Sequence, residues 1–216
     1  MIFSKSAREA MDVARECPQP SLCWIVADRD GHIGMQGCGR FPKRAPGHNG
    51  VVPLPAWQTR NHWRGWIPKD QLPRIYDPPE GFVATANEDI NSLGGPLLVT
   101  HPLPDYRKRR IVEKLTGLKD ATLEDMQKMQ YDLVSLHARD MLKVFLPHLE
   151  DGEIKRRLSS WDCRYSPDSR EATLFQRLYR NVMIEIFGHE RGVGWRRMLY
   201  LCTRAGFSTM ILTAAD

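Results

Sequence analysis

The side chain best placed to do chemistry is the amide of Asn87, at the end of a short apolar run. The stretch from Trp57 to Asn91 holds three tryptophans and four prolines, and the run Gly81–Ala86 stands directly before Asn87. Because proline fixes φ and removes a backbone donor, neither a helix nor a central strand can pass through the proline-rich part. We predict a long loop anchored by its indoles, followed by a strand over 82–86 that presents the amide at its end. On residue type alone, such an asparagine is typical of a cap on the turn after a strand.

Other groups that often carry chemistry lack the spacing that they would need. The five cysteines form no C-x-x-C pair, and their odd number leaves at least one thiol free. The seven histidines show neither H-x-x-H nor H-x-x-x-H spacing, so the sequence predicts no metal site and no bound cofactor. No G-x-S-x-G or S-x-x-K motif occurs, and Ser4 and Ser6 fall on a predicted helix. The chain therefore offers no evident nucleophile of its own.

The charge of the chain leaves two interpretations open. A net charge of +5 and a pI near 9.0 could indicate a polyanionic partner, but the Lys and Arg residues are scattered with acidic residues between them. The densest cluster, Arg107–Arg110, is only four residues long, which favours a solvated helix face. A nucleic-acid binder built on this cluster and on Arg196-Arg197 is the weaker alternative. No apolar run approaches the roughly 20 residues that span a bilayer, so we expect a soluble protein without a nucleic-acid or membrane partner.

The N-terminal part is predicted to contain a helix, a hairpin and a long loop. Four apolar residues recur at helical intervals in the first 17 residues, namely Phe3, Ala7, Met11 and Ala14. This segment has no signal-peptide core, so an export signal would have to lie on sequence not included here. Residues 21–27 and 33–37 flank the turn signal Asp30-Gly31 and predict a hairpin, and the continuous apolar run of its first strand predicts burial on both faces. Residues 40–79 are predicted to be a loop that shapes a cleft.

The second half of the chain is predicted to be helical. A helix over Tyr106–Leu115 comes first. A capping box at Thr122 then opens one long helix whose apolar spacing continues to Phe145. A last helix runs from Asp168 to Gly188 and is capped by Ser166. The sequence thus predicts an α+β protein, with a partial sheet and loops over 1–104 and a helical region over 105–216. At 216 residues it could be one domain or a slice of a larger one.

Ten short motifs follow one another in a fixed order along the chain. In the first half they are Ala27–Gly34, Gly39–Arg44, Trp63–Gly65, Ile67–Pro68, Leu72–Pro73, Pro78–Gly81 and Thr85–Asn87. In the second half they are Gln130–Ala138, Leu158–Asp162 and Asp168–Ala172. Each is weak alone, but in this order they resemble the penicillin amidase (penicillin acylase) family of N-terminal-nucleophile hydrolases. The resemblance covers about residues 3–187.

The resemblance implies a part of an αββα N-terminal-nucleophile hydrolase fold and two catalytic residues. Asn87 matches the asparagine whose side-chain amide donates to the oxyanion of the tetrahedral intermediate, a task that suits a fixed, uncharged N–H group. Arg107 matches an arginine that stabilises the surroundings of the nucleophile and orients that asparagine. Family members use a serine at a new N-terminus, far upstream of Thr85–Asn87. The isolated chain is therefore expected to be catalytically silent.

The resemblance also implies partners, substrates and a location. The partners would be the remainder of the precursor, or its α and β chain segments, and a small-molecule amide of a hydrophobic acyl group, of β-lactam side-chain or acyl-homoserine lactone type. The location would be periplasmic or secreted. Calcium is possible in the full-length protein, although no ligands for it are identified here. Two residues depart from the family pattern, because Glu88 stands where a second Asn is common and Ala56 where Gly is usual.

A different class of function stays open. The chain could be a non-catalytic product of a truncated or split gene that acts only as an interaction or structural partner. If the chain is instead a slice of a larger hydrolase, the strand with Trp24, Ile25 and Val26 would lack sheet neighbours in the free chain. We therefore expect exposed apolar surface and poor solubility when the chain is produced alone.

Overall fold

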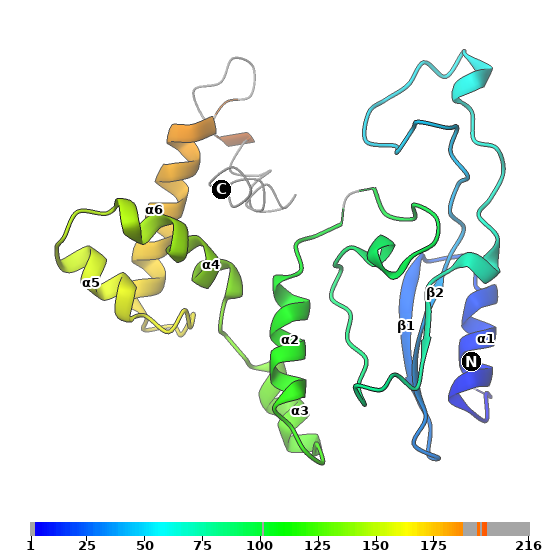
Figure 1. The fold of residues 1–216 in the computed structure, drawn as a ribbon, viewed down its shortest axis with the longest axis horizontal. Helices are drawn as coiled ribbons and strands as arrows, with labels where there is room; N and C mark the ends of the chain where they lie inside the picture. The colour runs from blue at the N-terminus through cyan, green and yellow to red at the C-terminus, as the bar shows by residue number, and fades with distance from the viewer. Residues whose placement is uncertain (1–2, 101, 188–193, 195, 198–216) are drawn as a thin grey trace. The chain divides into compact units, whose positions relative to one another are not determined.

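One helix and a three-stranded antiparallel sheet form the centre of the N-terminal half (Figure 1). The computed structural model describes residues 3–100, 102–187, 194, 196 and 197. The chain divides into two units, Met1–Pro102 and Leu103–Asp216, and each has buried residues of its own. Strands occur only in the first unit of the described chain and most helices lie in the second, so the predicted α+β class is confirmed.

Helix α1 (Ala7–Glu16) packs its apolar side on the sheet. Ala7, Met11 and Ala14 are buried at the spacing that the sequence predicts. Phe3 lies before the helix and is 91% exposed, so the prediction that it joins the apolar side is wrong. The backbone N–H of Ala7 donates to the Asp28 carboxylate at 2.8 Å, which ties the start of the helix to the hairpin.

Strands β1 (Leu22–Ala27) and β2 (Ile33–Cys38) form the predicted hairpin, and β3 (Arg74–Tyr76) pairs with the other edge of β2. The third strand lies inside the segment that the sequence predicts to be loop, so the prediction is wrong for these three residues. A three-residue strand is too short to show an alternating pattern. It exists because Ile75 pairs with Met35 in the sheet, 40 residues away.

Burial of β1 differs from the prediction. Leu22 and Ile25 are 48% and 49% exposed, whereas the central strand β2 is nearly all buried. Helix α1 lies close against β2, where Gly34 leaves room for the Met11 side chain. No second layer covers the outer face of β1 within the described residues. Burial of β1 on both faces is therefore wrong for this chain by itself.

The loop between β2 and β3 is long, as predicted, but its tryptophans do not anchor it. Trp57 is 83% exposed and Trp63 is 62% exposed. Main-chain hydrogen bonds hold the loop instead: Lys43 N–H donates to the Gly65 carbonyl at 2.9 Å, and Arg64 N–H donates to the Lys43 carbonyl at 2.7 Å. Two short 3-10 turns, η1 (Thr59–Asn61) and η2 (Lys69–Gln71), follow in the loop.

The predicted strand over 82–86 is not a strand in the structure. The segment enters no sheet among the described residues, in which the sheet consists of β1, β2 and β3. It leads into η3 (Ile90–Leu93). The apolar run satisfied the sequence pattern of a strand, but a strand also needs a neighbour with which to share backbone hydrogen bonds.

The second unit is helical, as predicted. In chain order its elements are α2 (Tyr106–Thr116), α3 (Leu123–Gln130), α4 (Leu136–Phe145), η4 (Leu146–His148), α5 (Glu153–Ser160) and α6 (Arg170–Phe187). Their shared core includes Met141, Phe145, Leu158, Phe175 and Met183. The capping box at Thr122 is present, with both of its hydrogen bonds. Helix α6 begins two residues later than predicted, and Ser169 rather than Ser166 accepts from its first turn, while Gly188 lies outside the described residues.

The single helix predicted from Thr122 to Phe145 is two helices, because residues 131–135 break it. The N–H of Ser135 donates to the Cys163 carbonyl at 2.9 Å, and Tyr165 N–H donates to the Leu133 carbonyl at 3.0 Å. The Ser135 hydroxyl then caps α4 by accepting from Ala138 N–H at 3.1 Å. A helix that ran straight through could not make these long-range bonds. Among the described residues, no helix has both the length and the apolar character needed to cross a bilayer.

Candidate active-site segments

Asn87 lies on an exposed turn whose backbone is left-handed. Its φ is 67°, a conformation that Asn adopts more readily than most residues other than Gly. Ala86 before it and Glu88 after it are both buried, whereas Asn87 itself is exposed. The turn therefore holds one amide side chain at the surface between two fixed neighbours.

Glu88 folds back onto the segment that precedes Asn87. Its Oε2 accepts from the Ala86 backbone N–H at 2.7 Å and from the Thr85 hydroxyl at 3.2 Å. The residue is only 6% exposed. A carboxylate in this position ties down the backbone on the N-terminal side of the turn. These bonds account for at least one oxygen of the carboxylate beside Asn87.

The segment after the turn is held by another asparagine, Asn91, which sequence reasoning missed. Its Oδ1 accepts from Leu98 N–H at 2.8 Å and from Val99 N–H at 3.2 Å, and its Nδ2 donates to the Val99 carbonyl at 2.8 Å. Asp89 caps the short helix η3 by accepting from Asn91 N–H at 2.9 Å. Both sides of Asn87 are thus fixed by side-chain bonds to backbone. Only a dense run of Asn and Asp residues could have signalled this.

Arg107, the second predicted site residue, is exposed in the first turn of α2. Together with Tyr106, Arg110 and His137 it lines a hollow of about 730 Å³ in the helical unit. Asn87 belongs to the first unit and Arg107 to the second, and each is placed by its own unit. Arg107 is therefore an exposed arginine at the start of a helix, and it lines a hollow.

The other arginines of the basic cluster are paired within the unit. Both terminal nitrogens of Arg109 donate to Asp140 Oδ2 at 3.0 Å, and Arg110 binds Asp132 and Glu113. The Arg110 bond holds the pKa of Asp132 below its ordinary value. Arg109 and Arg110 are thus engaged in ion pairs, which agrees with the helix-face interpretation of the cluster's charge.

His137 contributes a neutral imidazole to the helical hollow. Burial lowers its pKa, and its Nε2 has no hydrogen-bond partner among the described residues. The ring meets Tyr106 and Tyr179 edge to face, with centroids 5.3 and 5.0 Å apart. No sequence pattern singles out His137, because a lone histidine on a helix is usually structural.

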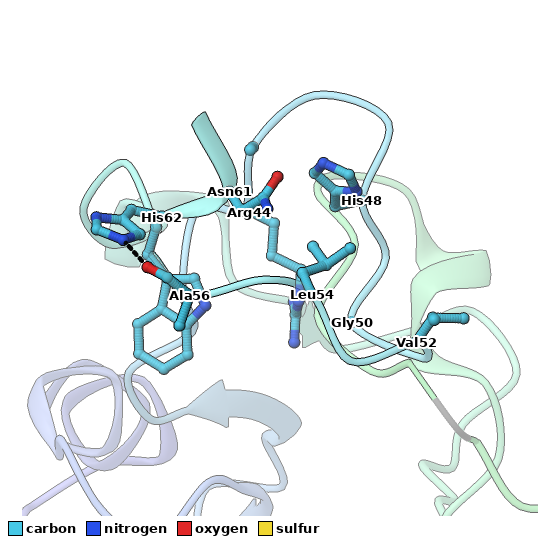
Figure 2. Close-up of a pocket in the computed structure, with 10 residues that line it drawn as sticks. Arg44, His48, Gly50, Val52, Leu54, Ala56, Asn61 and His62 are labelled. Atoms are coloured by element: carbon cyan, nitrogen blue, oxygen red, sulfur yellow. Dashed lines mark hydrogen bonds between the residues drawn. The ribbon is translucent and has the colours of Figure 1, made fainter. Parts of the chain in front are cut away.

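A separate hollow of about 430 Å³ lies in the loop between β2 and β3 (Figure 2). It is lined by Arg44, His48, Asn61 and His62 together with apolar side chains. The prediction that the loop shapes a cleft is confirmed, but the sequence pattern did not indicate which residues line it. In the described part of the chain, no three His, Cys, Asp or Glu side chains are grouped so that they could hold a metal ion.

Comparison with known proteins places the chain beside acylases. The family model described as penicillin amidase matches residues 1–213. The penicillin acylase 2 proenzyme of Pseudomonas sp. (strain SE83) is 32% identical over 163 residues, which cover 72% of this chain and 21% of that protein. The acyl-homoserine lactone acylase QuiP of Pseudomonas fluorescens (strain Pf-5) is 27% identical, over 89% of this chain and 26% of its own length.

The fold is also shared with a solved acylase structure. The thermostable penicillin G acylase from Alcaligenes faecalis matches with a TM-score of 0.67 at 18% identity, covering 86% of this chain and 37% of that one. The chain thus spans about a quarter or less of the length of the curated relatives it matches. The family match over nearly the whole chain nevertheless confirms the resemblance in the sequence motifs. The chain belongs to the penicillin amidase family.

Proposed function

We propose that this chain is part of a penicillin amidase-type hydrolase, and that Asn87 supplies an oxyanion donor to its active site. The observation that carries the proposal is the geometry of the turn, in which an exposed amide in a left-handed conformation stands between segments fixed by Glu88 and Asn91. Donors to an oxyanion act best when they are already in place before the reaction, because no reorganisation is then needed as charge develops.

The reaction would be the hydrolysis of a linear amide bond. A nucleophile adds to the carbonyl carbon, the carbonyl oxygen becomes negative, and the amine leaves with a proton before water releases the acid. The Asn87 Nδ2–H group would donate to the oxygen while it is negative. The nucleophile is expected from the remainder of the precursor, as in family members, so the chain would work only together with that remainder.

We infer the substrate class from the names of the relatives. The names of these two relatives specify penicillin and acyl-homoserine lactones, which are both amides of acyl groups. We infer an amide of a small hydrophobic acyl group as the substrate. The sheet of this chain would form part of an αββα sandwich, and the missing layers would cover the exposed side chains of β1.

Arg107 is proposed as a positioning residue. Its place in the first turn of α2, at the mouth of the helical hollow, allows its charge to act on groups outside this unit. A permanent cation near an amine base would lower the pKa of that base and keep it neutral. Replacing it with lysine in the assembled enzyme should shift the pH profile less than replacing it with glutamine, because lysine keeps the charge.

The test of the proposal is the Asn87→Ala substitution in the assembled precursor, assayed on an acyl amide. We expect kcat to fall about a hundred- to a thousand-fold, the effect of losing one oxyanion donor, with a much smaller change in KM. Asn181→Ala removes an exposed amide from α6 and is the matched control. An Asn87→Ala enzyme with unchanged kcat would overturn the assignment. The chain produced without the remainder should show no activity, because the nucleophile would be missing.

A further inference from the structure

The loop between β2 and β3 departs from the mixed charge pattern of the rest of the chain. From residue 31 to residue 69 there is no Asp or Glu at all. The same segment carries six basic side chains, Arg40, Lys43, Arg44, Arg60, Arg64 and Lys69. A folded segment with this bias attracts anions, and the loop hollow lies within it.

Arg44 is the charged residue of this hollow and its guanidinium has no partner within the described chain. Its Nη1 is buried and makes no hydrogen bond, and no ion pair to the side chain is formed. The guanidinium lies against Gly50, where a Cβ atom would come within 2.6 Å of Nε and 3.1 Å of Cζ. Gly50 therefore makes room for the group. Arg44 also lines the hollow, so its permanent positive charge favours an anion there.

Asn61 also offers a donor to the hollow, and the His62 ring beside it is held in place. The Nε2–H of His62 donates to the Ala56 carbonyl at 2.6 Å, because a carbonyl can only accept, and this bond fixes the ring. Asn61 uses one amide hydrogen on the Pro55 carbonyl at 3.0 Å and keeps the other. In the view of Figure 2, Arg44 and Asn61 lie between His62 on one side and His48 on the other.

The other side chains that line the hollow are mostly apolar, so they favour a ligand with an apolar part. Val52, Leu54 and Trp63 line the hollow, and none of its lining residues is acidic. A volume of about 430 Å³ lies in the range of pockets that hold small organic molecules. An inorganic anion would leave these walls without contacts, whereas a compact apolar group would cover them.

We propose that the loop hollow is a binding site for a small carboxylate with a compact aromatic or branched apolar body. The Arg44 guanidinium binds the carboxylate, His48 and Asn61 flank it, and the apolar side chains hold the body. The proposal is independent of the role of Asn87, since it concerns binding by the loop and requires no hydrolysis.

The test is an NMR titration of the chain, assembled with the remaining precursor segments, with benzoate, benzamide and inorganic phosphate. The ring signals of His48 and His62 should shift with benzoate and saturate, while those of His148 in the other unit stay fixed. Benzamide has the same shape without the charge and should bind about tenfold or more weakly, the value expected for loss of a hydrogen bond to a charged group. Phosphate should also bind at least about tenfold more weakly than benzoate, because it gains nothing from the apolar walls.

The matched variants are Arg44→Gln and Arg64→Gln. Both remove one positive charge from the same loop, but the exposed Arg64 does not line the hollow. Arg44→Gln should weaken benzoate binding about tenfold or more, whereas Arg64→Gln should leave it within about twofold. If Arg44→Gln unfolds, the titration of the unsubstituted chain still decides the question.

Three results would overturn the proposal. Equal affinity for phosphate and benzoate would mean that the loop is only a basic surface that binds anions in general. A short single-stranded oligonucleotide that displaces benzoate and binds more tightly would identify a nucleic-acid surface instead. Absence of histidine shifts at millimolar benzoate would mean that the hollow holds no carboxylate at all.

Discussion

At the scale of single residues, position 87 must meet two separate requirements. Its backbone must adopt a left-handed conformation, and its side chain must supply an amide donor. The left-handed φ of 67° restricts which residues can stand there, and the exposed amide is not needed to fill a core. Glycine adopts this conformation freely but has no side chain, whereas a β-branched residue is strained in it. The two requirements can therefore be tested by two substitutions at one position.

We predict that Asn87→Gly abolishes most activity of the assembled enzyme but leaves its stability within about 0.5 kcal/mol of the parent. Asn87→Val should lose activity and also about 1–2 kcal/mol of stability, because valine is strained at positive φ. Denaturant unfolding measures the stability and an amide hydrolysis assay the activity. If both variants unfold at the same denaturant concentration as the parent, the backbone at residue 87 is not held in this conformation.

At the scale of elements, β3 is joined to the hairpin by an ion pair that responds to pH. His32 Nδ1 lies 2.7 Å from Asp77 Oδ2, and Asp77 Oδ1 accepts from Ile33 N–H at 2.9 Å. The hydrogen bond to Asp77, with the nearby charges of Asp28 and Asp30, raises the pKa of His32 above its ordinary value of 6.5. The bond from Ile33, and then that from His32, lowers the pKa of Asp77 below its ordinary value of 3.8.

The two shifts predict a stability window. The His32 contribution is fully present below pH 6.5 and is lost as the pH rises through its raised pKa in the folded state. The Asp77 contribution is present above pH 3.8 and is lost as the pH falls through its lowered pKa. The contact between His32 and Asp77 should therefore stabilise the folded chain most in weakly acidic solution. His32→Gln should remove part of the fall in stability as the pH rises above 6.5, whereas His48→Gln should leave it in place. Identical profiles for the parent and His32→Gln would show that the pair contributes nothing.

The break between α3 and α4 supports a second prediction at this scale. Ser135→Ala should destabilise the chain by about 1 kcal/mol, since it removes the hydroxyl that caps α4. Ser160→Ala, near the end of α5, is the control, because its hydroxyl bonds only to the Arg157 carbonyl of its own helix. Denaturant midpoints measure both. Equal midpoints would mean that the break is held by the bonds to Cys163 and Tyr165 alone.

The elements show what sequence patterns can and cannot predict. Helices α1 and α2, the β1–β2 hairpin and the capping box at Thr122 follow from local periodicity, turn residues and caps, so they were predictable. Strand β3 and the break at 131–135 depend on partners 28 or more residues away, and local patterns do not encode these partners. For the site, motif order identified Asn87 and Arg107 as candidates. Two features were not predictable from the sequence, because they depend on three-dimensional contacts. They are the hydrogen bonds of Glu88 to Thr85 and Ala86, and the hollow around Arg44.

At the scale of the whole molecule, apolar side chains are exposed where a larger protein would cover them. Leu22 and Ile25 of the edge strand β1 are about half exposed, and Trp57 and Trp63 are more exposed still. The chain matches only 21% and 26% of the length of two relatives in the family. Edge strands with apolar faces are sites of aggregation unless another segment covers them.

We therefore predict that the chain produced alone binds a dye for apolar surface and associates with itself. Ile25→Lys should reduce both effects, because a charge on the open face of an edge strand opposes pairing with another copy. Val13→Lys changes an exposed apolar residue on α1, away from the strand edge, and is the control. Dye fluorescence and sedimentation of the free chain measure the effect, and addition of the remaining precursor segments should suppress it in the parent. A free chain that stays monomeric, binds no dye and unfolds in one sharp transition would mean that β1 needs no covering layer.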